Sequence, residues 1–402
     1  MYDLRLTAEQ LEIRETVRDF ALREVKPLAL DPERLQRFER DFPPGVLAQA
    51  SQMGLRTLGL AEELGGAGAD NLTACIVAEE LAAGEVGIAA ILARTSTLAR
   101  TLFEAATPAQ RDRFLPAFLA DDGFHLAWAA RDDSDDVVAN YHRAPTGTNE
   151  GGITARRQGG DWLLNGAQFV ANAPIAKLIV VEAASADGVQ TLLVPSATPG
   201  LAVREPKAFG TGPEGEGVRS WFHGSGGELT LRDCRVPADN ALQNTKTDDR
   251  RVPLDEALGL GIGRAAFDAA VEYAKLRVQG GRRLIEHQAI GNLLAEVAVN
   301  LEVARNMVWR AAWASDHPEA FADRSLDDLP LTAVAKAFTA EAVYQATLQS
   351  AEVFGAMGVM RDMPLQKYVQ DARVLRYAQP SSLSAKLAIA ERVAGFRRAS
   401  GR

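Results

Sequence analysis

The sequence has few cysteines, few histidines and no excess of positive charge, and each shortage excludes a class of protein. Its 402 residues include only Cys75 and Cys234, too few for a disulfide framework or a four-cysteine metal site. The five histidines show no metal-ligand spacing, so we predict no metal site. A net charge of −9 argues against a nucleic-acid partner, which would require a basic face.

Long apolar runs are also missing. No run approaches the roughly 18 apolar residues that span a bilayer, and Met1–Arg5 does not open a secretory signal. We therefore expect no membrane segment and a cytoplasmic location, where both thiols stay reduced. The 47% hydrophobic and 24% charged residues that are present are typical of a soluble globular protein with two or three domains.

Residue patterns divide the chain into three domains, at 1–122, 123–242 and 243–402. The first is helical, and Thr7–Gln10 and Thr107–Gln110 both fit the capping box that starts a helix. Short β-rich segments separated by Gly and Pro follow, and long alanine-rich amphipathic segments end the chain. We predict an α+β fold, mostly α: an N-terminal helical domain, a small β-barrel-like middle domain and a C-terminal four-helix bundle.

The predicted elements have these bounds. Helices are expected at Val46–Met53 and Leu72–Ala83, closed by Gly54 and Gly84, and at Ala265–Leu276, His287–Ala314, Leu331–Phe354 and Ser381–Gly395. Strands are expected at Trp162–Val170, Leu178–Glu182, Thr191–Val194 and Glu228–Val236.

Three segments carry a resemblance to a known family. Leu58–Gly68 reads LGLAEELGGAG, Asn172–Ala176 reads NAPIA, and Arg277–Gln288 opens with Arg and closes with Glu-His-Gln. Each segment alone is a weak signal, but their order and spacing across almost the whole chain are similar to those of the acyl-CoA dehydrogenases.

The resemblance implies a cofactor, a substrate and partners. FAD is expected between the β domain and the C-terminal bundle, with its adenine end reaching a neighbouring subunit. An acyl-CoA thioester would lie against the flavin. A Glu in the family takes the α-proton while the β-hydrogen leaves as hydride to the flavin, and an electron-transfer flavoprotein or a similar acceptor then takes the electrons.

The family base is missing from this chain. The stretch that begins with Asp371-Ala372-Arg373 keeps the family spacing, but Gln379 stands where the family has Glu. A neutral amide cannot accept a proton near pH 7. Some members carry the base near the start of the last domain, where Asp255 is a possible substitute here; a helix-start carboxylate favoured by the dipole is the alternative interpretation. Asp249 and Arg251 are candidates for contact with the acyl-CoA.

The flavin-facing segments of the family also differ here. The resemblance maps its Thr-Glu-Pro-x-x-Gly-Ser-Asp loop onto Trp128–Asp135, where Ser134-Asp135 persists beside further carboxylates at Asp132, Asp133 and Asp136. That loop is interpreted either as a reshaped cofactor contact or as a solvated acidic loop. The family Trp-Ile-Thr maps onto Phe169-Val170-Ala171, so Phe169 can still stack and Ala171 offers no hydroxyl.

Further cofactor positions lie in the last domain. By resemblance, Arg277 and Gln288 would hold the diphosphate and adenine side of FAD. The family Gln-x-x-Gly-Gly-x-Gly becomes Glu352–Gly358, with Gly355 kept and Glu in place of Gln. Ser381 replaces a Thr and keeps a hydroxyl.

Three functions stay open on these residues. The first is an FAD-dependent acyl-CoA dehydrogenase that acts on the α,β-carbons of a thioester, as a homotetramer. The second is a catalytically silent subunit in a heterotetramer with a Glu-bearing homologue. The third is a repurposed flavoprotein on the same fold, such as a monooxygenase or a lyase, which needs no α-proton base.

Overall fold

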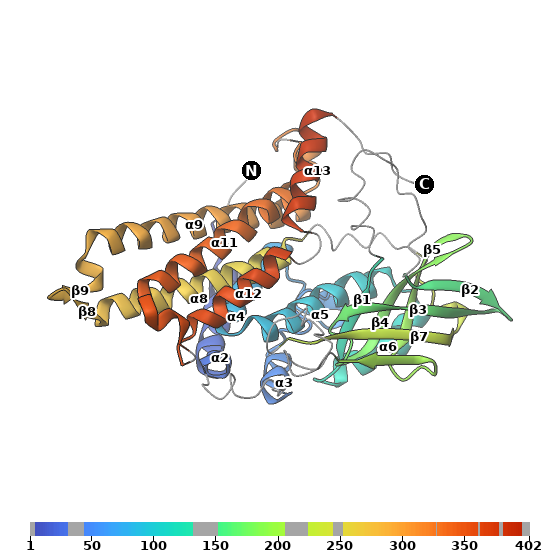
Figure 1. The fold of residues 1–402 in the computed structure, drawn as a ribbon. Helices are drawn as coiled ribbons and strands as arrows, with labels where there is room; N and C mark the ends of the chain where they lie inside the picture. Colours follow the sequence, from blue (N-terminus) through green and yellow to red (C-terminus); the bar gives the residue numbers. More distant parts are fainter. Residues whose placement is uncertain are drawn as a thin grey trace. The chain divides into compact units, whose positions relative to one another are not determined.

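The computed structural model describes residues 5–30, 44–131, 152–205, 224–243, 252–326, 328–360, 362–377 and 381–395. The chain divides into two compact units (Figure 1). The helical unit comprises Met1–Phe38, Asp70–Ala90 and Arg251–Arg397, and the sheet unit comprises mainly Glu39–Ala69 and Ile91–Arg250. Each unit is described by itself. The three predicted domain boundaries stay predictions.

The helical unit contains most of the long helices. They are α1 (Ala8–Phe20), continued by a π-helical turn η1 (Ala21–Val25), α2 (Lys26–Leu30), α4 (Asn71–Gly84), α8 (Leu254–Leu276), α9 (Gln288–Asp316), α10 (Glu319–Ala322), α11 (Leu331–Phe354), α12 (Leu365–Tyr377) and α13 (Ser382–Ala394). Short elements join them: β8 (Val278–Gln279), β9 (Arg282–Arg283), η6 (Leu284–Glu286) and η7 (Gly355–Val359).

Local sequence signals set several helix ends. Thr7 and Thr107 each accept a hydrogen bond from the backbone N–H of the Gln three residues on, which confirms both capping boxes. Gly54 is left-handed, with φ 82°, just after α3. The prediction that Gly84 closes a helix was wrong, because α4 runs through Gly84 and its C-cap is Glu85 in an extended conformation.

The C-terminal helices pack as long neighbours, with α8 and α11 each in contact with α9 and α12 (Figure 1). The prediction placed the fourth helix of this bundle at Ser381–Gly395. The structure adds α12 before it, and α13 packs on α11. The sequence pattern also started α8 eleven residues late, because Gly259, Gly261 and Gly263 interrupt the helical propensity of its first half.

The sheet unit is built on a curved sheet with helices on one side. Its helical elements are α3 (Pro44–Gln52), η3 (Glu62–Leu64), most of α5 (Val86–Ala105), α6 (Pro108–Ala120) and η4 (Ala238–Asn240). Its strands are β1 (His125–Ala129), β2 (Thr154–Gln158), β3 (Asp161–Ala171), β4 (Ala176–Ser185), β5 (Gly188–Pro195), β6 (Leu201–Arg204) and β7 (Gly226–Val236). All four predicted strands are confirmed, whereas β1, β2 and β6 were not predicted.

The strand order is β1-β4-β2-β3-β7-β6, with β5 paired to β4. Within the described residues this path has two free ends, so the sheet is not a closed barrel. One face carries an apolar core that includes Trp162, Leu164, Ile179 and Leu229. On the other face, a second cluster joins β1, β4 and β5 to the apolar stripes of α5 and α6. The predicted fold class, mostly helical with a central β region, is confirmed.

Helix α5 has the length and apolar composition of a membrane-spanning helix, but 72% of that window is buried within the protein. Burial of this kind is expected of a core helix in a globular protein, so α5 by itself is weak support for a membrane segment.

Candidate functional site

The end of β3 presents two of the predicted residues on one face. Side chains alternate along a strand, and Val170 is buried in the sheet core while Phe169 and Ala171 are partly exposed. Phe169 and Ala171 therefore share the face of β3 that points away from that core. The segment predicted to face the flavin thus forms a continuous surface with one aromatic ring and one small side chain.

Gly226 fixes the position of the Phe169 ring. It pairs with Ala171 across the β3–β7 ladder. A Cβ added at Gly226 would lie 2.8 Å from Cζ of Phe169, closer than van der Waals contact allows. The edge of the ring therefore lies close to Gly226, and any larger residue at this position would require the ring to move.

The residue after Ala171 anchors this strand end to the rest of the sheet unit. Asn172 adopts φ 64°, is 1% exposed, and donates its side-chain amide to the carbonyls of Ile91 and Leu126. Its backbone N–H donates to the Ser225 carbonyl at 2.9 Å. Asn172 Oδ1 and Ser225 Oγ are buried and find no hydrogen-bond partner within the described part of the chain.

The end of β1 lies beside β3. Gln168 Nε2 donates to the Ala130 carbonyl at 2.6 Å, and the Arg131 N–H donates to Glu182 Oε2 at 2.8 Å. Trp128 packs on the helix-covered side of β1. The structure thus brings the two segments that the resemblance assigned to the flavin next to each other, as far as Arg131. Ser134 and the carboxylates from Asp132 to Asp136 lie outside the described residues.

A separate group of predicted residues lies at one end of the helical unit. Arg277 is the C-cap of α8 and Gln288 is the first residue of α9; both are exposed. The hairpin between them is closed by the Leu284 N–H donating to the Arg277 carbonyl and by a hydrogen bond between His287 Nε2 and the Gln279 carbonyl. This end therefore carries an exposed guanidinium and the N-terminus of a long helix, and both kinds of group bind phosphate.

The end of α11 belongs to the same part of the helical unit. Tyr273 of α8 stacks on Phe354 of α11 with ring centroids 4.1 Å apart, and Gly355 then ends α11 with φ 57°. Glu352 is exposed, so water solvates its carboxylate. This exposure reduces the penalty that a Glu beside a diphosphate would otherwise carry.

The predicted catalytic positions are only partly described. Gln379, Asp249 and Arg251 lie outside the described residues. Asp255 is partly buried in the first turn of α8, where a helix dipole favours a carboxylate. Ser381 is the N-cap of α13 and accepts a hydrogen bond from the Ser384 N–H at 3.2 Å, a role that the sequence analysis missed.

The neighbour of Asp255 is the more unusual carboxylate. Glu256 is 5% exposed, and its Oε1 lies 3.4 Å from Nζ of Lys336, which is 4% exposed. Burial raises the pKa of the Glu256 carboxyl, and the Lys336 charge opposes that rise only in part. The sequence analysis did not find this contact, because a lysine 80 positions away gives no local signal.

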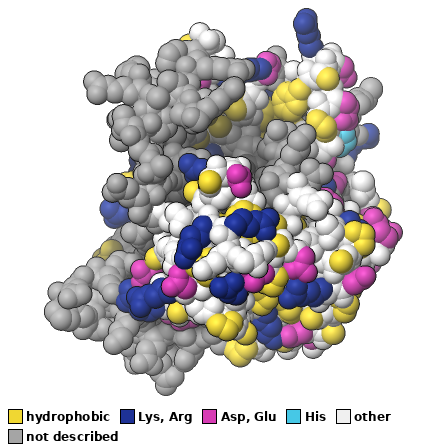
Figure 2. All heavy atoms as spheres, turned by 90° about the vertical axis from the view of Figure 1, so that its right-hand side faces the viewer, with side chains coloured by type: hydrophobic (Ala, Val, Ile, Leu, Met, Phe, Trp, Pro, Cys, Tyr) yellow, Lys and Arg dark blue, Asp and Glu magenta, His cyan; other side chains and the backbone are white. Residues whose placement is uncertain are grey.

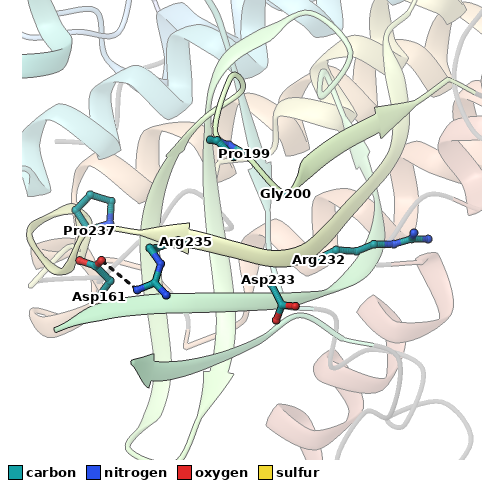
Figure 3. Close-up of a pocket in the computed structure, with 7 residues that line it drawn as sticks. All are labelled: Asp161, Pro199, Gly200, Arg232, Asp233, Arg235 and Pro237. Carbon is teal, nitrogen blue, oxygen red and sulfur yellow. Dashed lines mark hydrogen bonds and ion pairs between the residues drawn. The ribbon is translucent and has the colours of Figure 1, made fainter. Parts of the chain in front are cut away.

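A hollow on the sheet unit does not coincide with the predicted site. It has a volume of about 510 Å³ and is lined by Asp161, Pro199, Gly200, Arg232, Asp233, Arg235 and Pro237 (Figure 3). Figure 3 shows Arg235 turned toward Asp161, with which it forms an ion pair. Neither Phe169 nor Ala171 is among the residues that line this hollow.

Figure 2 shows basic and acidic side chains interspersed over the described surface in that view. Ion pairs such as Arg204–Glu228 neutralise several of the arginines of the sheet unit.

Comparison with known proteins identifies the family. Residues 7–122 match the acyl-CoA dehydrogenase N-terminal domain, and residues 256–394 match the acyl-CoA dehydrogenase C-terminal domain. The chain is 29% identical over 411 residues to a probable acyl-CoA dehydrogenase, YngJ, of Bacillus subtilis (strain 168), covering 97% of this chain and 99% of that protein. It is 30% identical over 398 residues to the mitochondrial short-chain specific acyl-CoA dehydrogenase of Rattus norvegicus, covering 94% of this chain and 88% of that protein.

The fold has solved counterparts. A glutaryl-coenzyme A dehydrogenase in complex with glutaryl-CoA superposes with a TM-score of 0.82 at 24% identity, covering 100% of this chain and 99% of that one. At this identity the likeness concerns the fold alone. Together with the two domain matches and the full-length relatives, it leads to one conclusion: this chain belongs to the acyl-CoA dehydrogenase family.

Proposed function

We propose that this protein is an FAD-dependent flavoprotein that dehydrogenates an acyl-CoA thioester at its α,β-carbons. The observation that carries the proposal is the end of β3, where the partly exposed Phe169 ring lies close to Gly226 and shares a face of the strand with the small side chain of Ala171. The names of the rat and Bacillus subtilis relatives support the reaction class.

The residues present fit FAD. Phe169 offers an aromatic face to a flat ring system, and the buried Asn172 Oδ1 and Ser225 Oγ beside it have hydrogen-bonding capacity left within the described residues. At the end of the helical unit, Arg277 and Gln288 are exposed and suited to the diphosphate and adenine side. When bound, FAD supplies the acceptor for the hydride that leaves the β-carbon.

The α-proton needs an acceptor other than Gln379. Asp255 is our candidate, because it is a partly buried carboxylate at the start of α8, near the part of the sequence where some family members carry their base. Asp249 and Arg251, just before α8, remain proposed contacts for the acyl-CoA. An electron-transfer flavoprotein as acceptor, a homotetramer and a cytoplasmic location are part of the same proposal.

A second function is favoured by one specific observation. Gln379 and Ala171 each lack the side-chain group that the family uses at its position. Both losses are expected in a catalytically silent subunit that supports a Glu-bearing homologue in a heterotetramer.

One experiment separates the two proposals. The purified protein is reconstituted with FAD, and acyl-CoA thioesters of increasing chain length are added without oxygen while the flavin absorption is followed. Dehydrogenation predicts bleaching in the wild type, loss of bleaching in Asp255→Asn, and no change in the control Glu272→Gln, which alters an exposed carboxylate of the same helix. Retained flavin that no acyl-CoA bleaches would exclude the dehydrogenase and leave the silent subunit and the repurposed flavoprotein. Gln379→Glu alone is not expected to restore turnover while Ala171 remains.

A further inference from the structure

The turn between β3 and β4 begins at Asn172, the first residue of the Asn172–Ala176 segment. Asn172 lies in the left-handed region, with φ 64°. Its carbonyl accepts hydrogen bonds from the N–H groups of both Ile175 and Ala176, each at 3.0 Å. This one residue therefore sets the direction in which the chain leaves the end of β3.

The Asn172 side chain ties this turn to two other elements of the sheet unit. The residue is 1% exposed, and its Nδ2 donates to the Ile91 carbonyl of α5 at 3.3 Å and to the Leu126 carbonyl of β1 at 3.4 Å. Carbonyl oxygens only accept hydrogen bonds, so the side-chain nitrogen must face them and the side-chain oxygen cannot. These two bonds hold the end of β3 against α5 and β1.

The backbone of Asn172 connects the same turn to β7. Its N–H donates to the Ser225 carbonyl at 2.9 Å, and Gly226, the first residue of β7, pairs with Ala171. Gly226 is also the residue whose missing side chain leaves room for the Phe169 ring. Asn172 thus holds both strands whose ends form the surface of Phe169 and Ala171.

Asparagine meets two requirements that this position combines. Asn and Asp adopt the left-handed conformation more readily than most other side chains, and glycine adopts it without a steric penalty. An ionised Asp has no N–H to donate to the two carbonyls, and glycine has no side chain at all. Of these three residues, only asparagine supplies both the backbone conformation and the donors.

We propose that Asn172 is a positioning residue, which holds the end of β3 against α5, β1 and the start of β7 so that Phe169 and Ala171 present a fixed surface to the flavin. This inference rests on the proposed function, in which that surface faces FAD. In this role Asn172 acts through Ala171 and Gly226, and its side-chain nitrogen contacts carbonyls of the protein rather than the cofactor.

Two substitutions separate the donors of Asn172 from its backbone conformation. Asn172→Asp keeps the size of the side chain and the oxygen at Oδ1, but it replaces the donating nitrogen by an oxygen that faces two carbonyls. Asn172→Gly keeps the left-handed backbone and removes the whole side chain. If the donors hold the strand end, both variants weaken FAD binding.

Two controls account for backbone strain and for stability. Asp233→Gly changes another left-handed residue of the sheet, with φ 47°, which is exposed and hydrogen-bonded to Asn165 of β3. Leu164→Ala removes buried methyl groups from the core side of β3 and so lowers stability at a residue outside the turn. The FAD affinity and the flavin spectrum of both controls are expected to match the wild type.

Hydrogen exchange of the flavin-free proteins, read by mass spectrometry, is the first measurement. We expect the amides of residues 172–176 to exchange about tenfold faster in Asn172→Gly and Asn172→Asp than in the wild type. Peptides from residues 178–195, in β4 and β5, are expected to exchange as in the wild type. Unchanged exchange at 172–176, or acceleration spread evenly over the sheet unit in both variants, would overturn the proposal.

Flavin binding is the second measurement, and it separates positioning from a merely structural contact. We expect about tenfold weaker FAD binding by both variants and, at saturating FAD, a visible circular dichroism spectrum of the bound flavin that differs from the wild-type spectrum. Wild-type affinity and spectrum in either variant would overturn the proposal, even where the turn exchanges faster. A wild type that binds no FAD would contradict the proposed function, and the exchange measurement, which needs no flavin, would still test the anchoring by Asn172.

Discussion

The two units bury different kinds of side chain. Among the described residues, the helical unit buries carboxylates and lysines together: Glu79, Glu80, Glu85, Glu256, Lys336, Lys367 and Asp371. In its described part the sheet unit buries one arginine, Arg56, and one histidine, His125, but no carboxylate, and one face of its sheet carries a large apolar core.

The difference follows from what holds each unit in register. A β-ladder aligns neighbouring strands through backbone hydrogen bonds, so the side chains between them can all be apolar. Helices exchange no backbone hydrogen bonds with one another, and apolar ridges tolerate several arrangements. A buried ion pair is satisfied only when its two partners meet, so we infer that these pairs select one arrangement of the helices.

The largest expected effect is at the carboxylate pair of α4. Arg264 Nη2 contacts Glu80 at 2.6 Å and its Nη1 contacts Glu79 at 3.3 Å. Burial alone would raise the pKa of Glu80, but hydrogen bonds from Arg264 and Arg18 outweigh it and hold that pKa below its usual range. Arg264→Met is expected to lower the free energy of unfolding by about 3–5 kcal/mol in denaturant titrations.

The control for this change is Lys275→Met, which breaks an exposed pair and is expected to cost less than about 1 kcal/mol. Equal losses in the two variants would show that the buried charges of the helical unit add nothing to its stability.

The corresponding substitution in the sheet unit truncates an apolar side chain. Leu164 of β3 is fully buried in the sheet core. Leu164→Ala removes buried methyl groups and leaves a cavity, for which we expect a loss of about 2–5 kcal/mol. Neither this loss nor the Arg264→Met loss should depend strongly on salt, because buried ion pairs are screened much less than exposed ones. A loss below about 1 kcal/mol for Leu164→Ala would contradict the tight apolar packing of the sheet core.

A pH titration sharpens the comparison at His125, the one buried histidine in the described part of the sheet unit. Burial, followed by the nearby Arg56 charge, lowers the pKa of His125 from 6.5 to about 4. Between these values the unfolded chain holds a proton that the folded chain does not, so stability falls as pH falls through this range, by about 3 kcal/mol in total. His125→Gln is expected to lose less stability than the wild type between pH 7 and pH 4 in thermal or denaturant unfolding. An equal loss of stability in the wild type and in His125→Gln over this pH range would contradict the lowered pKa of His125.

The smallest expected effect on stability is at Gly226. Gly226→Ala forces the Phe169 ring to move, because the new Cβ would lie 2.8 Å from Cζ. We expect about 1–3 kcal/mol of destabilisation together with reduced FAD content, measured by the flavin absorbance per chain. Gly45→Ala in α3, where a Cβ meets nothing within 4 Å, should leave FAD content unchanged. Full FAD content in Gly226→Ala would show that FAD binding does not depend on the position of the Phe169 ring.

Local signals predicted the features that depend on neighbours in sequence. Capping boxes at Thr7 and Thr107, strands with alternating burial and the order of family motifs are all encoded within a few residues. Helix α12 was missed because its pattern follows Pro364 and contains Lys367 and Asp371, charged residues that read as surface but are buried against Glu85. Its burial is set by a partner about 280 positions away.

The candidate site likewise contains residues that local sequence predicted and residues that only the structure reveals. Phe169 and Ala171 were predicted from the motif, whereas Gly226 and Asn172, which fix their surroundings, come from segments that the motif does not include. Ser381 was predicted to keep a useful hydroxyl, and the structure shows that hydroxyl in use as a helix cap. The Glu256–Lys336 contact joins two helices and has no signature within either one.

The central claim is that the end of β3 is the flavin-facing surface of this protein. An absorbance titration of the flavin-free protein with FAD, in the wild type and in Phe169→Ala, tests it most directly. The account predicts saturable FAD binding by the wild type and at least about tenfold weaker binding by the variant, since the aromatic face is lost. Equal affinity in both proteins, or no FAD binding by the wild type, would contradict it.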